Sequence, residues 1–135
     1  MKHYLAAILT AGLVACAGEP SSQQVCSTMI EGDSETAMDI RQDGIEPAEL
    51  CACIGATIDA MDVKEKATHL AVMNAVTAIR ENQGGGVEAA AEFLEEQLRA
   101  SEGGYAFDED AFQNTGRLLN KVGDQLEDDG SCAAG

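Results

Sequence analysis

Apolar positions along the chain recur mostly three or four residues apart, which is the spacing of an amphipathic helix. The clearest case lies near the C-terminus, where Asp108 is suited to cap a helix that continues to about Glu127. Its apolar stripe, which is typical of a helical bundle, consists of Phe112, Thr115, Leu119, Val122 and Leu126. No stretch alternates apolar and polar side chains in the manner of a half-buried strand. The pattern therefore predicts an all-α domain.

Proline and aspartate mark the starts of two helices in the middle of the chain. Pro47 suits the first position of a helix, and one face of that helix carries Leu50, Ile54, Ile58 and Met61. Asp62 is suited to cap a second helix, which continues to Gln83 and has on its outward face Lys64, Lys66, Arg80 and Glu81. Gly84-Gly85-Gly86 ends it with a turn short enough to join antiparallel helices.

Three shorter segments complete the predicted domain. Residues 87–100 are rich in Ala and Glu and present an apolar face, and residues 25–31 form a short amphipathic helix. Residues 33–43 are largely polar, so only one or two helical turns are expected there. The sequence thus predicts a small bundle of about four to five helices within residues 25–135.

The chain is strongly acidic. It has 8 basic and 24 acidic side chains, with a formal net charge of −16. Loss of residues 1–15 would remove Lys2 and no acid, which leaves 7 basic side chains and a charge of −17. Such a surface repels nucleic acid and anionic lipid headgroups, and it favours a basic protein partner or cations. The same charge also serves to keep a small domain soluble.

The first fifteen residues have the composition of an export signal. Lys2 is the one charged residue among residues 1–12, and the apolar run after it is too short to span a bilayer. The run ends in Leu13-Val14-Ala15-Cys16, and here the chain resembles bacterial lipoproteins, in which an aliphatic residue and two small or tolerated residues precede an acylated cysteine. The resemblance implies that residues 1–15 are a cleaved signal peptide and that Cys16 carries lipid chains.

Lipidation at Cys16 would hold the domain at a membrane, since two or more acyl chains give stable anchoring. Ala17 follows the cysteine, and among lipoproteins this implies the outer membrane of the bacterial envelope, facing the periplasm or the cell surface. Residues 16–24 then form a polar tether of about 25 Å at full extension. Ordinary secretion is the alternative, because Ala15-Cys16-Ala17 also fits the small-residue cleavage pattern.

Four cysteines remain inside the predicted domain: Cys26, Cys51, Cys53 and Cys132. An even number of cysteines in a small exported domain predicts disulfides, here two, for which three pairings are open. Residues two apart on a helix point about 200° away from each other, so a bond between Cys51 and Cys53 would break the helix. We therefore expect each of these two cysteines to bond with one of Cys26 and Cys132, in either order.

Cys51-Ala52-Cys53 also has a chemical alternative to disulfides. Two thiolates at this spacing suit a soft metal such as Cu(I) or Zn(II) if the backbone between them is not helical. Further ligands would come from Met29, Met61, Met73 and His69. Disulfides are favoured because exported cysteines are usually oxidised, and methionines at helical spacing are usually core residues.

The sequence has no pattern typical of an enzyme. His69 is the only histidine after residue 15, and no motif for nucleophilic catalysis surrounds it. The spacing Cys26…Cys51-x-Cys53 is similar to that of small uncharacterised proteobacterial exported proteins, a similarity that implies no activity. We expect a non-enzymatic envelope lipoprotein without a cofactor, acting as a binding, structural or inhibitor-type module. The alternative is a periplasmic metal-binding protein that uses Cys51 and Cys53.

Overall fold

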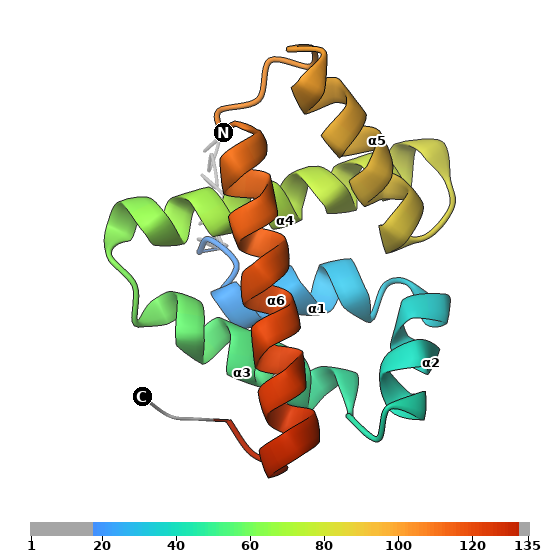
Figure 1. Ribbon diagram of the computed structural model, residues 1–135, viewed down its shortest axis with the longest axis vertical. Coiled ribbons are helices and arrows are strands. Elements are labelled where there is room, and N and C mark those ends of the chain that lie inside the picture. Colours follow the sequence, from blue (N-terminus) through green and yellow to red (C-terminus); the bar gives the residue numbers. More distant parts are fainter. Residues whose placement is uncertain (1–17, 133–135) are drawn as a thin grey trace, which may run out of the picture.

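The computed structural model describes residues 18–132, which form six α-helices and no strand (Figure 1). The helices are α1 (Ser22–Ile30), α2 (Ser34–Gln42), α3 (Pro47–Asp59), α4 (Val63–Gln83), α5 (Val87–Arg99) and α6 (Glu109–Asp129). The prediction of a small all-α bundle is confirmed. α2 has nine residues, more than the one or two turns predicted, and its ends carry a capping Asp33 and a basic Arg41. Cys16 and the predicted signal peptide lie outside the described residues.

α1 begins at Ser22, three residues before its predicted start, because a capping box forms there. The Ser21 hydroxyl accepts a hydrogen bond from the Gln24 N–H (3.2 Å), and the Gln24 side chain accepts one from the Ser21 N–H (2.8 Å). Ser22 itself is buried, and its hydroxyl donates to Asp59 at the end of α3 (2.7 Å). The folded domain therefore begins before the end of the predicted tether (residues 16–24).

α3 is the helix on which the core is built, and it contacts α1, α2, α4 and α6. Its Ile54 and Ile58 are completely buried, and each contributes about 1.5–3 kcal/mol by leaving water. α1 packs very closely on α3 at Gly55, where an added Cβ atom would lie 2.9 Å from the backbone nitrogen of Gln23. A side chain at position 55 would therefore push the two helices apart.

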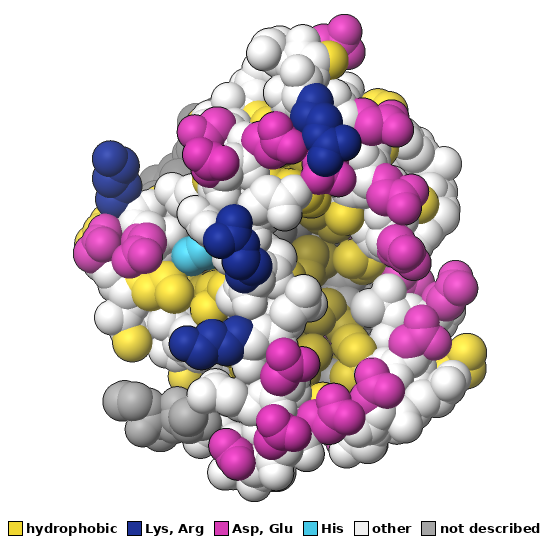
Figure 2. Space-filling view, in the orientation of Figure 1, with side chains coloured by type: hydrophobic (Ala, Val, Ile, Leu, Met, Phe, Trp, Pro, Cys, Tyr) yellow, Lys and Arg dark blue, Asp and Glu magenta, His cyan; other side chains and the backbone are white. Residues whose placement is uncertain are grey.

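The two longest helices, α4 and α6, each have 21 residues and pack on this core and on each other (Figure 1). As predicted, Asp62 caps α4, and its carboxylate accepts hydrogen bonds from the N–H groups of Lys64 and Glu65 (2.9 and 3.0 Å). The predicted cap Asp108 precedes α6 and accepts from the Ala111 N–H (2.9 Å). Figure 2, in the same orientation, shows apolar side chains in a hollow to the right of α6. Within residues 18–132, no helix combines the length and the apolar character that crossing a membrane requires.

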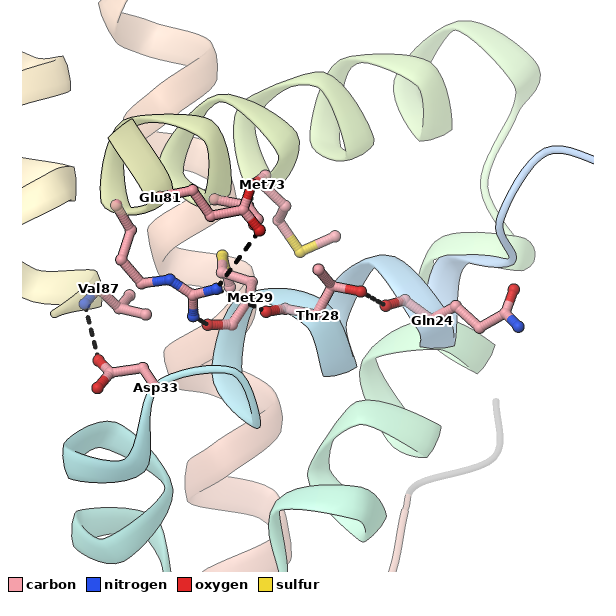
Figure 3. Close-up of polar contacts among 9 residues, drawn as sticks. Gln24, Thr28, Met29, Asp33, Met73, Glu81 and Val87 are labelled. Atoms are coloured by element: carbon pink, nitrogen blue, oxygen red, sulfur yellow. Dashed lines mark hydrogen bonds and ion pairs between the residues drawn. The ribbon is translucent and has the colours of Figure 1, made fainter. Parts of the chain in front are cut away.

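Arg80 of α4 fastens the C-terminal end of α1 (Figure 3). Its guanidinium donates hydrogen bonds to the backbone oxygens of Met29 (2.6 Å) and Thr28 (3.1 Å), which lie in the last turn of α1 and have no partner within the helix. Only 10% of the Arg80 side chain is exposed, so the prediction that it faces outward is wrong. A cation at a helix C-terminus also interacts favourably with the helix dipole.

Asp33 caps two helices at once. One carboxylate oxygen accepts from the Glu35 N–H in α2 (3.2 Å), and the other accepts from the Thr36 hydroxyl (2.7 Å) and the Val87 N–H of α5 (2.8 Å). Figure 3 shows the bond to Val87. The N-cap residue of α5 is Gly86, which has no side chain to cap its own helix. The hydrogen bond from Thr36, followed by those from the backbone N–H groups, lowers the pKa of Asp33 below its ordinary value of 3.8.

The contact at Gly55 can be tested against a glycine that has room around it. Gly55→Ala is expected to lower the free energy of unfolding by about 1–3 kcal/mol, because the methyl group meets the α1 backbone. Gly116→Ala on α6, where no atom lies within 4 Å, is expected to raise it by roughly 0.5–1 kcal/mol through helix propensity. Urea unfolding followed by circular dichroism measures both. Equal effects of the two substitutions would contradict the packing of α1 on α3.

The double cap predicts a pH-dependent stability. Because the pKa of Asp33 is lowered in the folded protein, its carboxylate stabilises the fold above pH 3.8, and this contribution is lost as the pH falls through the lower folded value. Asp33→Ala is therefore expected to lower the free energy of unfolding by about 1–2 kcal/mol at neutral pH, and by much less in strong acid. Asp39→Ala, an exposed charge change on the same helix, is the control. An Asp33 effect that stays constant down to strong acid would refute the capping role.

Candidate functional site

The structure joins the four domain cysteines in two disulfides. Cys26 of α1 is bonded to Cys51, and Cys53 is bonded to Cys132 in the C-terminal tail. The prediction of disulfide bonds is confirmed, and Cys51 and Cys53 have different partners. Cys26, Cys51 and Cys53 are buried, whereas Cys132 is exposed. The cysteines thus attach both ends of the described chain to α3.

This pairing leaves no thiolate at Cys51 or Cys53, and the backbone between them is helical. A soft-metal site at these two sulfurs would require reduction of both disulfides. Within residues 18–132 there is no group of three His, Cys, Asp or Glu side chains that could hold a metal ion. The remaining candidates for a functional site are two hollows in the surface, one on each side of α6.

The first such surface is an open cleft of ≈ 680 Å³ between the N-terminal halves of α4 and α6. We call it the His69 cleft. α4 contributes Lys64, Thr68 and His69 to its lining, and α6 contributes Asn114, Arg117 and Lys121. Figure 2 shows this region to the left of α6, with the histidine in cyan close to Lys and Arg side chains. The cleft therefore combines an imidazole with several cations.

We assign the proton on the His69 ring from the hydrogen bonds around it. His69 is 7% exposed, and its Nδ1 lies 2.8 Å from the Thr115 hydroxyl. That hydroxyl donates its single proton to the Ala111 carbonyl oxygen (2.9 Å), so it can only accept from His69. The proton of the neutral imidazole is therefore on Nδ1, and Nε2 carries a lone pair.

The lone pair on Nε2 is open to solvent. No hydrogen bond of Nε2 is found within the described part of the chain, and no fully buried side-chain nitrogen or oxygen there lacks a partner. Nε2 must therefore reach water, and the His69 cleft is the space next to the ring. His69 presents a fixed hydrogen-bond acceptor to whatever occupies the cleft.

Within residues 18–132, the cations of the cleft form no ion pairs. Seven basic side chains lie within residues 18–132, and four of them form ion pairs of 2.7–3.9 Å: Arg41, Lys66, Arg80 and Arg99. The other three all line the His69 cleft: Lys64, Arg117 and Lys121. With three acids to each base in the whole chain, this gathering of unpaired cations is unusual.

Four carboxylates also line the cleft, and two of them already have partners. Asp62 and Asp108 cap α4 and α6, and the N–H of Glu65 is the main cause of the lowered pKa of Asp62. The other two carboxylates belong to Glu65 and Asp110. The cleft can thus offer cations, carboxylates and one neutral acceptor to a polar ligand.

The second surface lies on the opposite side of α6, between α2, α3 and α6. We call it the acidic groove, a hollow of ≈ 290 Å³. It is lined by the apolar side chains of Ile30, Ile40, Ile45, Leu50, Ile54 and Leu119 and by the acids Asp43, Asp124 and Glu127, with Asn120 and Gly123. None of the described lysine or arginine residues lines it. Figure 2 shows the apolar hollow with acidic side chains along its edge.

The acidic character continues from this groove toward α5. Another hollow of ≈ 290 Å³, between α2 and α5, is lined by five acids and by no base of the described part of the chain: Asp33, Glu35, Asp39, Glu88 and Glu92. α6 therefore separates a cleft that holds unpaired cations from a surface that is apolar and acidic. The one signal of this division in the sequence is the order of charges along α6, where Arg117 and Lys121 precede Asp124 and Glu127.

Comparison of the chain with models of known protein families, with curated proteins and with solved structures finds no match. Both surfaces are therefore interpreted from their own geometry and charge.

Proposed function

We propose that this protein is a non-enzymatic lipoprotein of the bacterial cell envelope that binds a basic segment of a partner protein in the acidic groove. The observation that carries the proposal is the lining that residues 18–132 give the groove, which has an apolar floor, three carboxylates and no Lys or Arg side chain. An amphipathic segment with Lys or Arg beside a few apolar residues complements both properties. A volume of ≈ 290 Å³ suits one or two apolar side chains of the partner.

The charge of the whole domain supports the same kind of partner. A net charge of −17 after removal of the signal peptide would attract a basic protein over a distance and speed its association. Charges at the edge of a groove contribute mainly to association rate and specificity, whereas the apolar floor supplies affinity. Binding should therefore weaken as the salt concentration rises.

The proposed membrane anchor rests on the lipobox-like residues 13–16. Because α1 begins at Ser22, the tether between Cys16 and that helix would consist of five residues and would span about 20 Å when extended. Partners would then be met close to the membrane surface. The disulfides agree with an oxidising compartment outside the cytoplasm.

Replacement of the proposed lipidation site tests the anchor. Cys16→Ala is expected to move the protein from the membrane fraction to the soluble fraction of bacterial cells, because no lipid can be attached. Ala17→Asp leaves the cysteine in place and serves as the control, since it should remain bound to membrane. Immunoblots of washed membranes measure the distribution. Retention of Cys16→Ala in the washed membranes would refute lipid anchoring.

The acidic groove is tested with two labelled amphipathic peptides, one of Leu and Lys and one of Leu and Glu. Fluorescence anisotropy is expected to show binding of the Leu/Lys peptide that weakens with salt, and no binding of the Leu/Glu peptide. The double variant Asp124→Asn/Glu127→Gln is expected to weaken binding about fivefold, as two exposed charge pairs are lost.

The control for this experiment is Glu96→Gln/Glu102→Gln, which changes the net charge equally and lies outside the groove lining. It should leave the affinity for the Leu/Lys peptide nearly unchanged. If both double variants weaken binding to the same extent, attraction by the net charge explains the binding and the groove proposal fails.

A further inference from the structure

We propose that the His69 cleft binds a small molecule that carries a carboxylate or phosphate group together with a hydroxyl or amino group. The anionic group would lie among Lys64, Arg117 and Lys121, and the hydroxyl or amino group would donate a hydrogen bond to Nε2 of His69. This site lies across α6 from the acidic groove, so the inference is independent of the function proposed for that groove.

His69 supplies the first argument. The side chain is more than nine-tenths buried, and its Nδ1 lies 2.8 Å from the hydroxyl oxygen of Thr115. The ring therefore cannot turn without losing that hydrogen bond. Its remaining nitrogen is left to the cleft as an acceptor of known direction. An oriented acceptor of this kind selects ligands that carry a donor, because a ligand without one would leave the nitrogen unpaired.

The unpaired cations supply the second argument. Every other basic side chain within residues 18–132 forms an ion pair with a carboxylate, whereas these three do not. Of the three, Lys64 is close enough to Asp62 for its charge to help lower the pKa of that carboxyl group. Charge-assisted hydrogen bonds from Arg and Lys to carboxylate or phosphate oxygens are among the stronger polar contacts in proteins. A bound anion would form with these cations the ion pairs that they do not form within residues 18–132.

The carboxylates limit the ligand to a small one. Glu65 and Asp110 line the same cleft as the cations, so an extended polyanion would meet them and be repelled. A compact ligand with one anionic group avoids this, and its hydroxyl or amino groups can donate to the carboxylates. The cleft volume of ≈ 680 Å³ is within the range of small-molecule sites.

Two probes test the inference with the purified protein: sn-glycerol 3-phosphate for the phosphate form and L-lactate for the carboxylate form. Each has one or more hydroxyl groups. Long-range ¹H–¹⁵N NMR of the His69 ring reports both the proton on Nδ1 and any ligand bonded to Nε2. At least one probe is expected to shift the Nε2 resonance in a saturable way, whereas glycerol, which lacks the anionic group, does not.

Two variants with the same change of charge distinguish binding in the cleft from attraction by the net charge of the protein. Arg117→Gln, an exposed change, is expected to weaken binding of the active probe about tenfold, the effect of losing one charge-assisted hydrogen bond. Arg41→Gln makes the same charge change at the end of α2, away from the cleft, and should leave the affinity within about twofold. His69→Gln removes the imidazole signal and is followed by calorimetry, with circular dichroism to show that it folds.

Saturable binding of either probe supports the inference. The probe that binds more tightly shows whether the cleft prefers a phosphate or a carboxylate group. The inference is overturned if neither probe gives a saturable shift up to about 10 mM, the range of weak metabolite binding. It is also overturned if Arg41→Gln weakens binding as much as Arg117→Gln does.

Discussion

The contact between α1 and α3 is the constraint on which the rest of the structure depends. Gly55 lets the two helices approach until only hydrogen fits between their backbones, and the Cys26–Cys51 disulfide holds that contact. α4 then packs on α1, and Arg80 completes the hydrogen bonds at its end. Both candidate surfaces take their shape from this assembly, because α6 can lie only where α3 and α4 leave room.

Polar contacts join the remaining helices with few side chains. Asp33 supplies the start of α2 and the start of α5 with one carboxylate, and His69 joins α4 to α6 through Thr115. Each of these contacts satisfies groups that would otherwise lose their hydrogen bonds to water on folding. In a domain of this size, such contacts fix the arrangement of helices that the small apolar core alone leaves open.

Local chemistry made much of the fold predictable. The starts of α3, α4 and α6 follow from Pro47, Asp62 and Asp108, which act on groups within a few residues. The bonds of Arg80 to Met29, of Asp33 to Val87 and of His69 to Thr115 join residues 46–54 positions apart. These bonds depend on how the helices pack, which periodicity does not show. The helical pattern alone therefore placed Arg80 on the wrong face, and it did not predict the His69 cleft or the acidic groove.

The order of the two disulfides bears on how the chain is oxidised. Cys26 joins Cys51 and Cys53 joins Cys132, so each bond links cysteines that are consecutive in sequence. If the chain crosses a membrane with its N-terminus first, the first pair emerges complete while Cys132 is still on the other side. Native bonds can then form in the order of emergence by simple oxidation. A bond of Cys53 with either Cys26 or Cys51 would call for thiol–disulfide exchange. Where Cys53 has captured Cys26, the neighbouring thiolate of Cys51 is well placed to reverse it.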